Sequence, residues 1–360
     1  MTNPYTYKCK NGWTVKEINE SSVMSNKLIY CSNSDVCILA GDLPVIRLEK
    51  RVKLFGTILF YIFIKGEKVY LHNIRNITYK AKSGVCEWDI FPLENSQKIT
   101  ISVGNPKGER GLCAKISSNY NETVYFEYGD FIKFPIQPAA TKPGWNIHSK
   151  NTPPLANAIP DISKEPYEIS EENGEYTISV MDEKLLLNAD STKLYVNKDK
   201  KIVGETSGEA YLYLTLDKLY DTPKTAYKYV LERQKELSSS AKIDTPDMYL
   251  NTAMYSVAEE IDGHYNLSLI NHANYDYNEP FLGWYNRIGH ALCGWEDRLL
   301  KELEFYTKYQ VKKSKKTRFI PSVAHRECVA SRNSKMYGVG RINKYHQMYN
   351  MQSHGRRRVR

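Results

Sequence analysis

The sequence changes character at Thr222-Pro223-Lys224-Thr225-Ala226-Tyr227-Lys228-Tyr229-Val230-Leu231. Threonine followed by proline is typical of a helix N-terminus, because the threonine side chain caps the first turn and proline fits the first helical position. Tyr227, Val230, Leu231 and Leu237 then mark one face of a helix. This stretch therefore predicts the point where a β-rich part of the chain gives way to a helical part.

Upstream of this point, short runs of Val, Ile, Tyr and Phe are separated by turn signals such as Asn173-Gly174. Tyr176, Ile178 and Val180 alternate with polar residues, as expected of a half-buried strand. The apolar run from Leu54 to Ile64 is too short to span a bilayer and indicates a buried strand. Together these patterns predict an antiparallel β-sandwich over residues 1–217.

Downstream, two further helices are expected. One starts near Thr245-Pro246-Asp247, and the other carries Trp295, Leu299 and Leu303 on one face. Three helices and a long loop make a poor core, so the helical module assigned to residues 218–340 is expected to be incomplete. Residues 341–360 are cationic with few apolar side chains and are expected to be disordered.

The formal net charge of +9 is concentrated at the C-terminal end of the chain. Residues 311–360 contain 14 Lys and Arg but only one acid, Glu327, so the rest of the chain is slightly acidic. A basic tail without a recognisable module argues against specific nucleic-acid binding. The seven cysteines form no CxxC pair, which leaves neither a zinc ribbon nor a redox motif. The polar N-terminus carries no signal peptide, and no membrane span is predicted.

The segment from Asp262 to Arg298 is the most informative about function, and it is expected to be a long loop between two helices. It contains five acids, three histidines and two Gly-Trp steps. Such a mixture can stack on a sugar ring, bond its hydroxyl groups and place carboxyl groups beside a glycosidic bond. The simpler interpretation is structural: Trp284 and Trp295 are then core aromatics, and Arg298 and Glu302 form a surface pair along a helix.

Several motifs resemble an uncharacterised bacterial family catalogued as domain of unknown function 4450: Gly-Asp-Leu-Pro at 41–44, Ile261-Asp262-Gly263, Phe281-Leu282-Gly283-Trp284 and Gly294-Trp295-Glu296-Asp297-Arg298. The resemblance implies glycoside hydrolases from polysaccharide-degrading bacteria, with a β-sandwich followed by an (α/α)6 toroid of the six-hairpin glycosidase kind. It also implies export from the cell, and a toroid that continues beyond residue 360. Glu296 departs from the family pattern, in which histidine is more frequent.

The predicted site follows from the residues and from this resemblance. Hydrolysis needs two carboxyl groups that flank the bond. The catalytic candidates are Asp262, Asp297, Glu296 and Glu279, with Asp276 as a further acid. The substrate-binding candidates are His264, His272, Trp284, Arg287, Trp295 and Arg298.

No cofactor is predicted, and the spacing of His264 and His272 matches no zinc motif. The expected partner is a carbohydrate, whose identity and linkage the sequence does not specify. Two alternatives stay open. A polysaccharide lyase would use Tyr265, Tyr275, His264, Asn271 and Arg287 around a uronate. A non-catalytic sugar-binding protein would use the aromatic residues for stacking and the acids only for hydrogen bonding.

Overall fold

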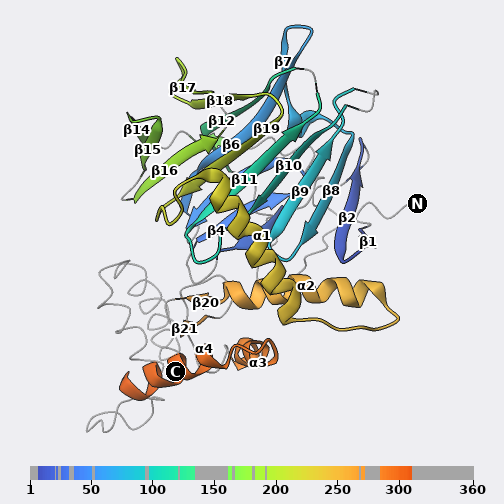
Figure 1. Ribbon diagram of the computed structural model, residues 1–360, viewed down its shortest axis with the longest axis vertical. Coiled ribbons are helices and arrows are strands. Elements are labelled where there is room, and N and C mark those ends of the chain that lie inside the picture. Colours follow the sequence, from blue (N-terminus) through green and yellow to red (C-terminus); the bar gives the residue numbers. More distant parts are fainter. Residues whose placement is uncertain are drawn as a thin grey trace, which may run out of the picture.

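Within the residues that the computed structural model describes, two large antiparallel β-sheets are followed by four α-helices and a two-stranded ribbon (Figure 1). These residues are 7–20, 22, 26–31, 36–50, 53–93, 97–120, 122–133, 161–163, 167–180, 183–190, 193–266, 269–271 and 284–309. The predicted basic tail and most of the proline-rich segment from 135 to 166 lie outside these ranges. The predicted change from strands to helices is confirmed, because the last strand of the sheets ends at Thr215 and the first helix begins at Pro223.

The larger sheet has ten strands, in the spatial order β1 (Lys8–Lys10), β2 (Trp13–Ile18), β8 (Ile77–Lys82), β9 (Val85–Ile90), β10 (Ile99–Gly104), β11 (Gly111–Ser118), β19 (Glu209–Thr215), β16 (Glu183–Asp190), β15 (Glu175–Val180) and β14 (Tyr167–Glu172). The alternation predicted for Tyr176, Ile178 and Val180 is confirmed, since all three are buried in β15.

The second sheet has nine strands. Seven form the path β17 (Lys193–Val196), β18 (Ile202–Thr206), β12 (Val124–Lys133), β6 (Lys53–Ile64), β5 (Val45–Lys50), β4 (Val36–Gly41) and β3 (Asn26–Tyr30), while β7 (Glu67–Tyr70) pairs with β6 and β13 (Asp161–Ser163) pairs with β12. A short 3-10 helix, η1 (Leu71–Asn73), follows β7. The run from Leu54 to Ile64 is therefore a strand of this sheet, as its sequence predicts.

The two sheets share one apolar core, to which both contribute alternate residues such as Trp88 and Phe60. The Gly-Asp-Leu-Pro motif lies where the sheets meet. Trp88 of the larger sheet donates its indole N–H to the carbonyl of Gly41 at 2.9 Å, and Lys16 binds the buried carboxylate of Asp42 at 2.6 Å. Polar groups at this depth are retained because each has a partner. The motif thus joins the two layers.

Helix α1 (Pro223–Ser240) lies across the outer face of the ten-stranded sheet (Figure 1). Thr222 caps it by accepting a hydrogen bond from the amide of Thr225 at 3.2 Å, and Pro223 occupies the first turn, as predicted. Its apolar face, Ala226, Tyr227 and Val230, packs on side chains of β9, β11 and β19. Packing on this face fixes α1 relative to the sheet.

Helix α2 (Met248–Gly263) is capped by Asp247 and packs against α1. A two-stranded ribbon, β20 (Tyr265–Asn266) and β21 (Leu269–Ile270), follows it. Helices α3 (Trp284–Leu292) and α4 (Glu296–Tyr309) complete the described chain. No helix in the described ranges is long and apolar enough to cross a membrane.

The expectation of a long irregular loop from Asp262 to Arg298 is corrected, because α3 and the β20–β21 ribbon lie within it. Gly289 lies inside α3. A Cβ atom there would come within 2.7 Å of Ile261, so the glycine lets α3 approach α2 closely. Gly294, with φ of 74°, then turns the chain between α3 and α4. Gly289 therefore permits the packing of α3 on α2, and Gly294 permits the turn between α3 and α4.

Candidate functional site

Asp262 is at the centre of a buried ion cluster that joins three helices. One carboxylate oxygen accepts from Arg233 of α1 at 2.6 Å, and the other accepts from Arg298 of α4 at 2.7 Å. The side chains of Asp262 and Arg233 are each only 4% exposed. A buried carboxylate is stable only when its charge is matched, and here two guanidinium groups match it. The sequence-predicted pair Asp262 and Arg298 is thus brought together.

These guanidinium groups determine the protonation state of Asp262. Burial alone would raise the pKa of the carboxyl group, but the charges and hydrogen bonds of Arg233 and Arg298 outweigh it and lower the pKa below its ordinary value. The group is therefore a carboxylate at neutral pH and cannot serve there as a proton donor. Its chemistry is that of a fixed negative charge which holds two arginines in place.

Arg298 also contacts aromatic rings. Its guanidinium carbon lies 4.3 Å from the ring centre of Trp295 and 4.8 Å from that of Tyr265. Such cation–π contacts stabilise a desolvated guanidinium group and fix its orientation. Trp295 in turn lies beside His290, with 5.5 Å between ring centres. Trp295, in the turn between α3 and α4, and Arg298, at the start of α4, thus lie against each other.

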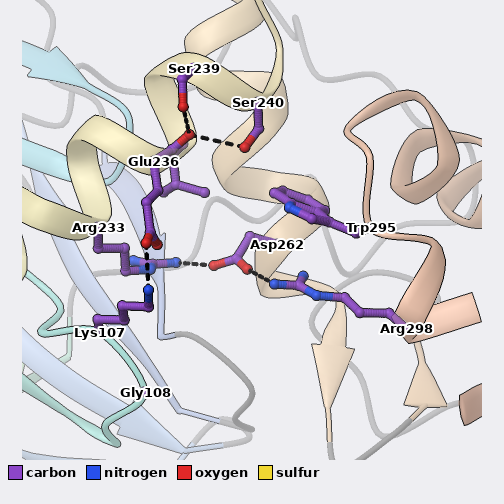
Figure 2. A pocket seen from close by; sticks show the side chains of 10 residues that line it. Lys107, Gly108, Arg233, Glu236, Ser239, Ser240, Asp262, Trp295 and Arg298 are labelled. Atoms are coloured by element: carbon purple, nitrogen blue, oxygen red, sulfur yellow. Dashed lines mark hydrogen bonds and ion pairs between the residues drawn. The ribbon is translucent and has the colours of Figure 1, made fainter.

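A pocket of about 390 Å³ lies between the β10–β11 loop of the larger sheet and the helices (Figure 2). The charged and aromatic residues that line it are Lys107, Arg233, Glu236, Asp262, Trp295 and Arg298. Figure 2 shows Lys107 reaching from the β10–β11 loop to form an ion pair with Glu236 of α1. Ser239 and Ser240, at the end of α1, donate to the carbonyl of Glu236. The pocket is polar, with one aromatic wall.

His264 and His290 are buried close to this cluster, with 6% and 0% of each residue exposed. Neither ring nitrogen of His290 has a hydrogen-bond partner among the described residues. Burial lowers the pKa of His290 to about 3, and the positive charge of Arg298 acts in the same direction. His290 is therefore neutral at neutral pH. Its role is packing beneath Trp295.

Arg287, predicted to bind substrate, forms a two-pronged ion pair with Glu302 of α4, at 2.6 and 2.9 Å, and also donates to the hydroxyl of Tyr306. Glu302 is 2% exposed and accepts from the backbone amide of Ile270 as well. These bonds tie α3, α4 and the β20–β21 ribbon together. The simpler interpretation, a surface pair between Arg298 and Glu302, does not hold, because Arg298 pairs with Asp262 and Glu302 with Arg287.

Asp297 and Glu296 lie in the first turn of α4 and are exposed. The side chain of Asp297 is 68% exposed and forms a 3.6 Å ion pair with Lys301, one turn along the helix. Acids in this position favour the helix dipole. Neither is among the residues that line the pocket. The structure therefore brings Asp262, Trp295 and Arg298 to one pocket and leaves Asp297 and Glu296 on the surface of α4.

Four predicted residues cannot be placed in this way. Glu279 and His272 lie outside the described residues, as does Asp276. Trp284 begins α3, but its side chain is not among those described. Within the described ranges, no group of three or more His, Cys, Asp and Glu residues is placed to hold a metal ion.

Sequence reasoning missed Lys107, Arg233 and Glu236. A signal for Arg233 was present: it falls on the same helical face as Tyr227, Val230 and Leu237. A cation on an apolar face indicates a buried partner. No comparable signal existed for Lys107, because its approach to α1 depends on the path of the β10–β11 loop.

Comparison with known proteins adds no identification. No protein-family model matches the chain, and no curated protein matches its sequence. The resemblance to domain of unknown function 4450 therefore stays a prediction.

Proposed function

We propose that this protein acts on a saccharide, as a glycoside hydrolase that binds its substrate at the pocket between the β-sheets and the helices. The observation that carries the proposal is the pocket itself, where Trp295 faces charged and hydroxyl groups. An aromatic ring beside convergent hydrogen-bonding groups suits a sugar, which has apolar ring faces and a polar edge. A volume of about 390 Å³ is of the size that small ligands occupy.

In this proposal Asp262 is a positioning residue. Its carboxylate holds Arg233 and Arg298 at the pocket wall, and its lowered pKa excludes it as the general acid at neutral pH. The acid and base are assigned to carboxyl groups that can reach solvent or substrate. Asp297 and Glu296 do not line the pocket, so in this proposal the substrate extends past Trp295 to the start of α4, where these two exposed acids are the candidates. Glu279 stays a candidate from the sequence. Two such groups must flank the bond, about 5 to 10 Å apart.

We also propose that α1 to α4 are the first helices of an (α/α)6 toroid. Large apolar side chains on these helices are exposed, which suits faces that pack on further helices. They include Leu250, Leu292, Leu300 and Leu303. The order along the chain, with the β-sheets first and the helices after them, is the order that this arrangement requires.

A non-catalytic saccharide-binding function is the second candidate. The specific observation in its favour is that Asp262 and Glu236, the carboxylates of the pocket, are both engaged by cations. A glycosidase needs one carboxyl group with a raised pKa. Asp262, whose pKa is lowered, does not supply one.

The experiment measures binding and cleavage together. The full chain is titrated with a panel of neutral and acidic oligosaccharides by calorimetry, and the same mixtures are assayed for new reducing ends. Hydrolysis that is lost in Asp297→Asn but kept in Asp199→Asn, an exposed acid in a distant turn, would support the hydrolase. Binding without cleavage of any sugar would support the second candidate. New ultraviolet absorbance from an unsaturated product would favour a lyase, and absence of any binding would reject all three.

A further inference from the structure

The charges that line the pocket are unbalanced. Three cations, Lys107, Arg233 and Arg298, face two carboxylates, Glu236 and Asp262. Both oxygens of Asp262 are already bound by the arginines. The remaining carboxylate, Glu236, is half exposed and belongs to the mouth of the pocket. The pocket therefore has an excess of positive charge.

Lys107 is held by a rigid loop. The Asn105 side chain donates to the carbonyls of Glu109 and Gly111 at 2.7 and 2.8 Å, and Tyr220 donates to the carbonyl of Lys107 at 2.5 Å. The buried Glu109 accepts from Thr215 and from the amide of Leu219. These bonds fix the backbone of Lys107 beside α1, while its side chain stays 50% exposed. The backbone that carries this cation therefore needs no rearrangement when a ligand binds.

The ion pair between Lys107 and Glu236 is exchangeable. Both side chains are about half exposed, and ion pairs of this kind contribute little free energy because water competes for each partner. An anionic group on a ligand can therefore replace Glu236 as the partner of Lys107. Release of Glu236 to solvent costs little for the same reason.

Arg298 provides a second cation deeper in the site. Its Nη1 has no hydrogen-bond partner among the described residues, although Nη2 binds Asp262. Nη1 lies beneath the pocket surface, so a ligand oxygen reaches it only after a shift of the guanidinium group. A buried donor without an acceptor is costly, which favours such a shift when an acceptor arrives. Even without this shift, the positive charge of Arg298 attracts an anionic ligand in the pocket.

We propose that the pocket selects a saccharide that carries an anionic group, a carboxylate or a sulfate, and that this group displaces Glu236 from Lys107. The inference rests on the proposed function, since the sugar ring is assigned to Trp295. Beyond that function, the saccharide is acidic, and Lys107 is the cation that recognises its anionic group. Arg298 adds positive potential behind the ligand.

Four probes test the inference on the full chain by calorimetric or NMR titration: glucuronate, glucose 6-sulfate, glucose and inorganic phosphate. The acidic sugars should bind roughly tenfold more tightly than glucose, as expected for one hydrogen bond to a charged group. Tighter binding of glucose 6-sulfate than of glucuronate would assign the group to sulfate, and the reverse to carboxylate. Either order supports the inference.

Two variants with opposite expected effects sharpen the test. Lys107→Gln should abolish the preference for acidic sugars, so that glucuronate binds no more tightly than glucose. Glu236→Gln should strengthen the binding of acidic sugars about threefold, because it removes the competing carboxylate. The matched controls are Lys228→Gln and Glu232→Gln, which alter an exposed Lys–Glu pair on α1 away from the pocket and should change nothing.

Several results would overturn the inference. If glucose and glucuronate bind equally, the pocket binds sugars without charge selection, and only the proposed function survives. If inorganic phosphate binds as tightly as glucuronate, the site recognises a simple anion. If Glu236→Gln weakens the binding of acidic sugars, Glu236 is part of the site and not its competitor. Failure of all sugars to bind would reject the proposed function itself.

Discussion

The strand-rich part and the helical part of this protein are held together by different forces. The core between the two sheets consists of large buried side chains, including Trp88, Phe55, Phe60 and Phe126. The described helices share only a small apolar cluster, built on Ala241, Ala258 and Cys293. What joins the helices is a set of buried ion pairs, centred on Asp262 and on Glu302. The stabilisation from apolar burial does not depend on the orientation of the groups, whereas a buried charge is stable only beside an opposite charge.

This difference predicts where substitutions act. The sheets supply apolar burial and a surface on which α1 packs. The helices hold their charged groups in ion pairs. We therefore expect changes in the sheets to affect the free energy of unfolding of the whole chain, and changes in the helices to act locally.

The largest effect is expected from Phe60→Ala in the sheet core. Phe60 is fully buried, and removal of its ring leaves a cavity that costs about 3 to 5 kcal/mol. Leu303→Ala on α4, where the leucine is 61% exposed, should cost less than about 0.5 kcal/mol. Urea unfolding of both variants measures the two values. Similar losses in the two variants would contradict the comparison.

The next effect concerns pH and His290. The folded pKa of about 3 lies below the ordinary value of 6.5, so the unfolded chain binds a proton that the folded chain excludes. Stability from this group is therefore present above pH 6.5 and is lost as the pH falls toward 3. The loss is roughly 4 kcal/mol at pH 3.

The measurement compares wild type with His290→Phe by thermal unfolding between pH 7 and pH 3. The variant should lose less stability over this window, because phenylalanine takes up no proton. Parallel pH profiles for the two proteins would show that His290 is protonated in the folded state, contrary to its burial.

A smaller, local effect is expected from Asp262→Asn. The change leaves Arg233 and Arg298 facing each other without their shared counter-charge, at a cost of about 3 kcal/mol. Hydrogen exchange should accelerate in α2 and α4 while the sheets stay protected. Asp297→Asn, an exposed control, should change exchange little. Uniformly faster exchange in sheets and helices would show that the two parts unfold as one.

The smallest effect is expected from Gly289→Ala. The new methyl group would meet Ile261 at 2.7 Å, and the overpacking should outweigh the gain in helix propensity by about 1 kcal/mol. In an Ile261→Ala background the same change should instead stabilise by about 1 kcal/mol, because only the propensity gain remains. Loss of stability in both backgrounds would mean that the clash is with another group. Thermal unfolding of the four proteins distinguishes these cases.

Local patterns in the sequence predicted much of the fold. The alternation in β15, the apolar run of β6 and the Thr222 cap are each properties of a few adjacent residues, and each is confirmed. Helix α3 was not predicted, because the whole segment from Asp262 to Arg298 was expected to be one long loop. The role of Gly289 depends on contact with α2, which no local pattern reveals.

The candidate site was predictable only in part, because a pocket is a long-range arrangement. Asp262, Trp295 and Arg298 were recognised as residues of interest, and they do meet. Their interactions were not foreseen: the partner that fixes Asp262 is Arg233, which lies 29 positions earlier in the sequence. Lys107 arrives from a strand loop over a hundred residues away from α1.

The position of α1 has a consequence for how this chain can be divided and recombined. Within two turns of this helix, Tyr227 and Val230 pack on the ten-stranded sheet, and Arg233 donates a hydrogen bond to Asp262. A hybrid protein joined at residue 217 would therefore separate the helix from the sheet that orients it. Exchange of either half for a foreign one should succeed only when α1 keeps a matching partner on both sides, the sheet surface on one and Asp262 on the other. Evolutionary or engineered recombination of the two halves is therefore limited by this one helix.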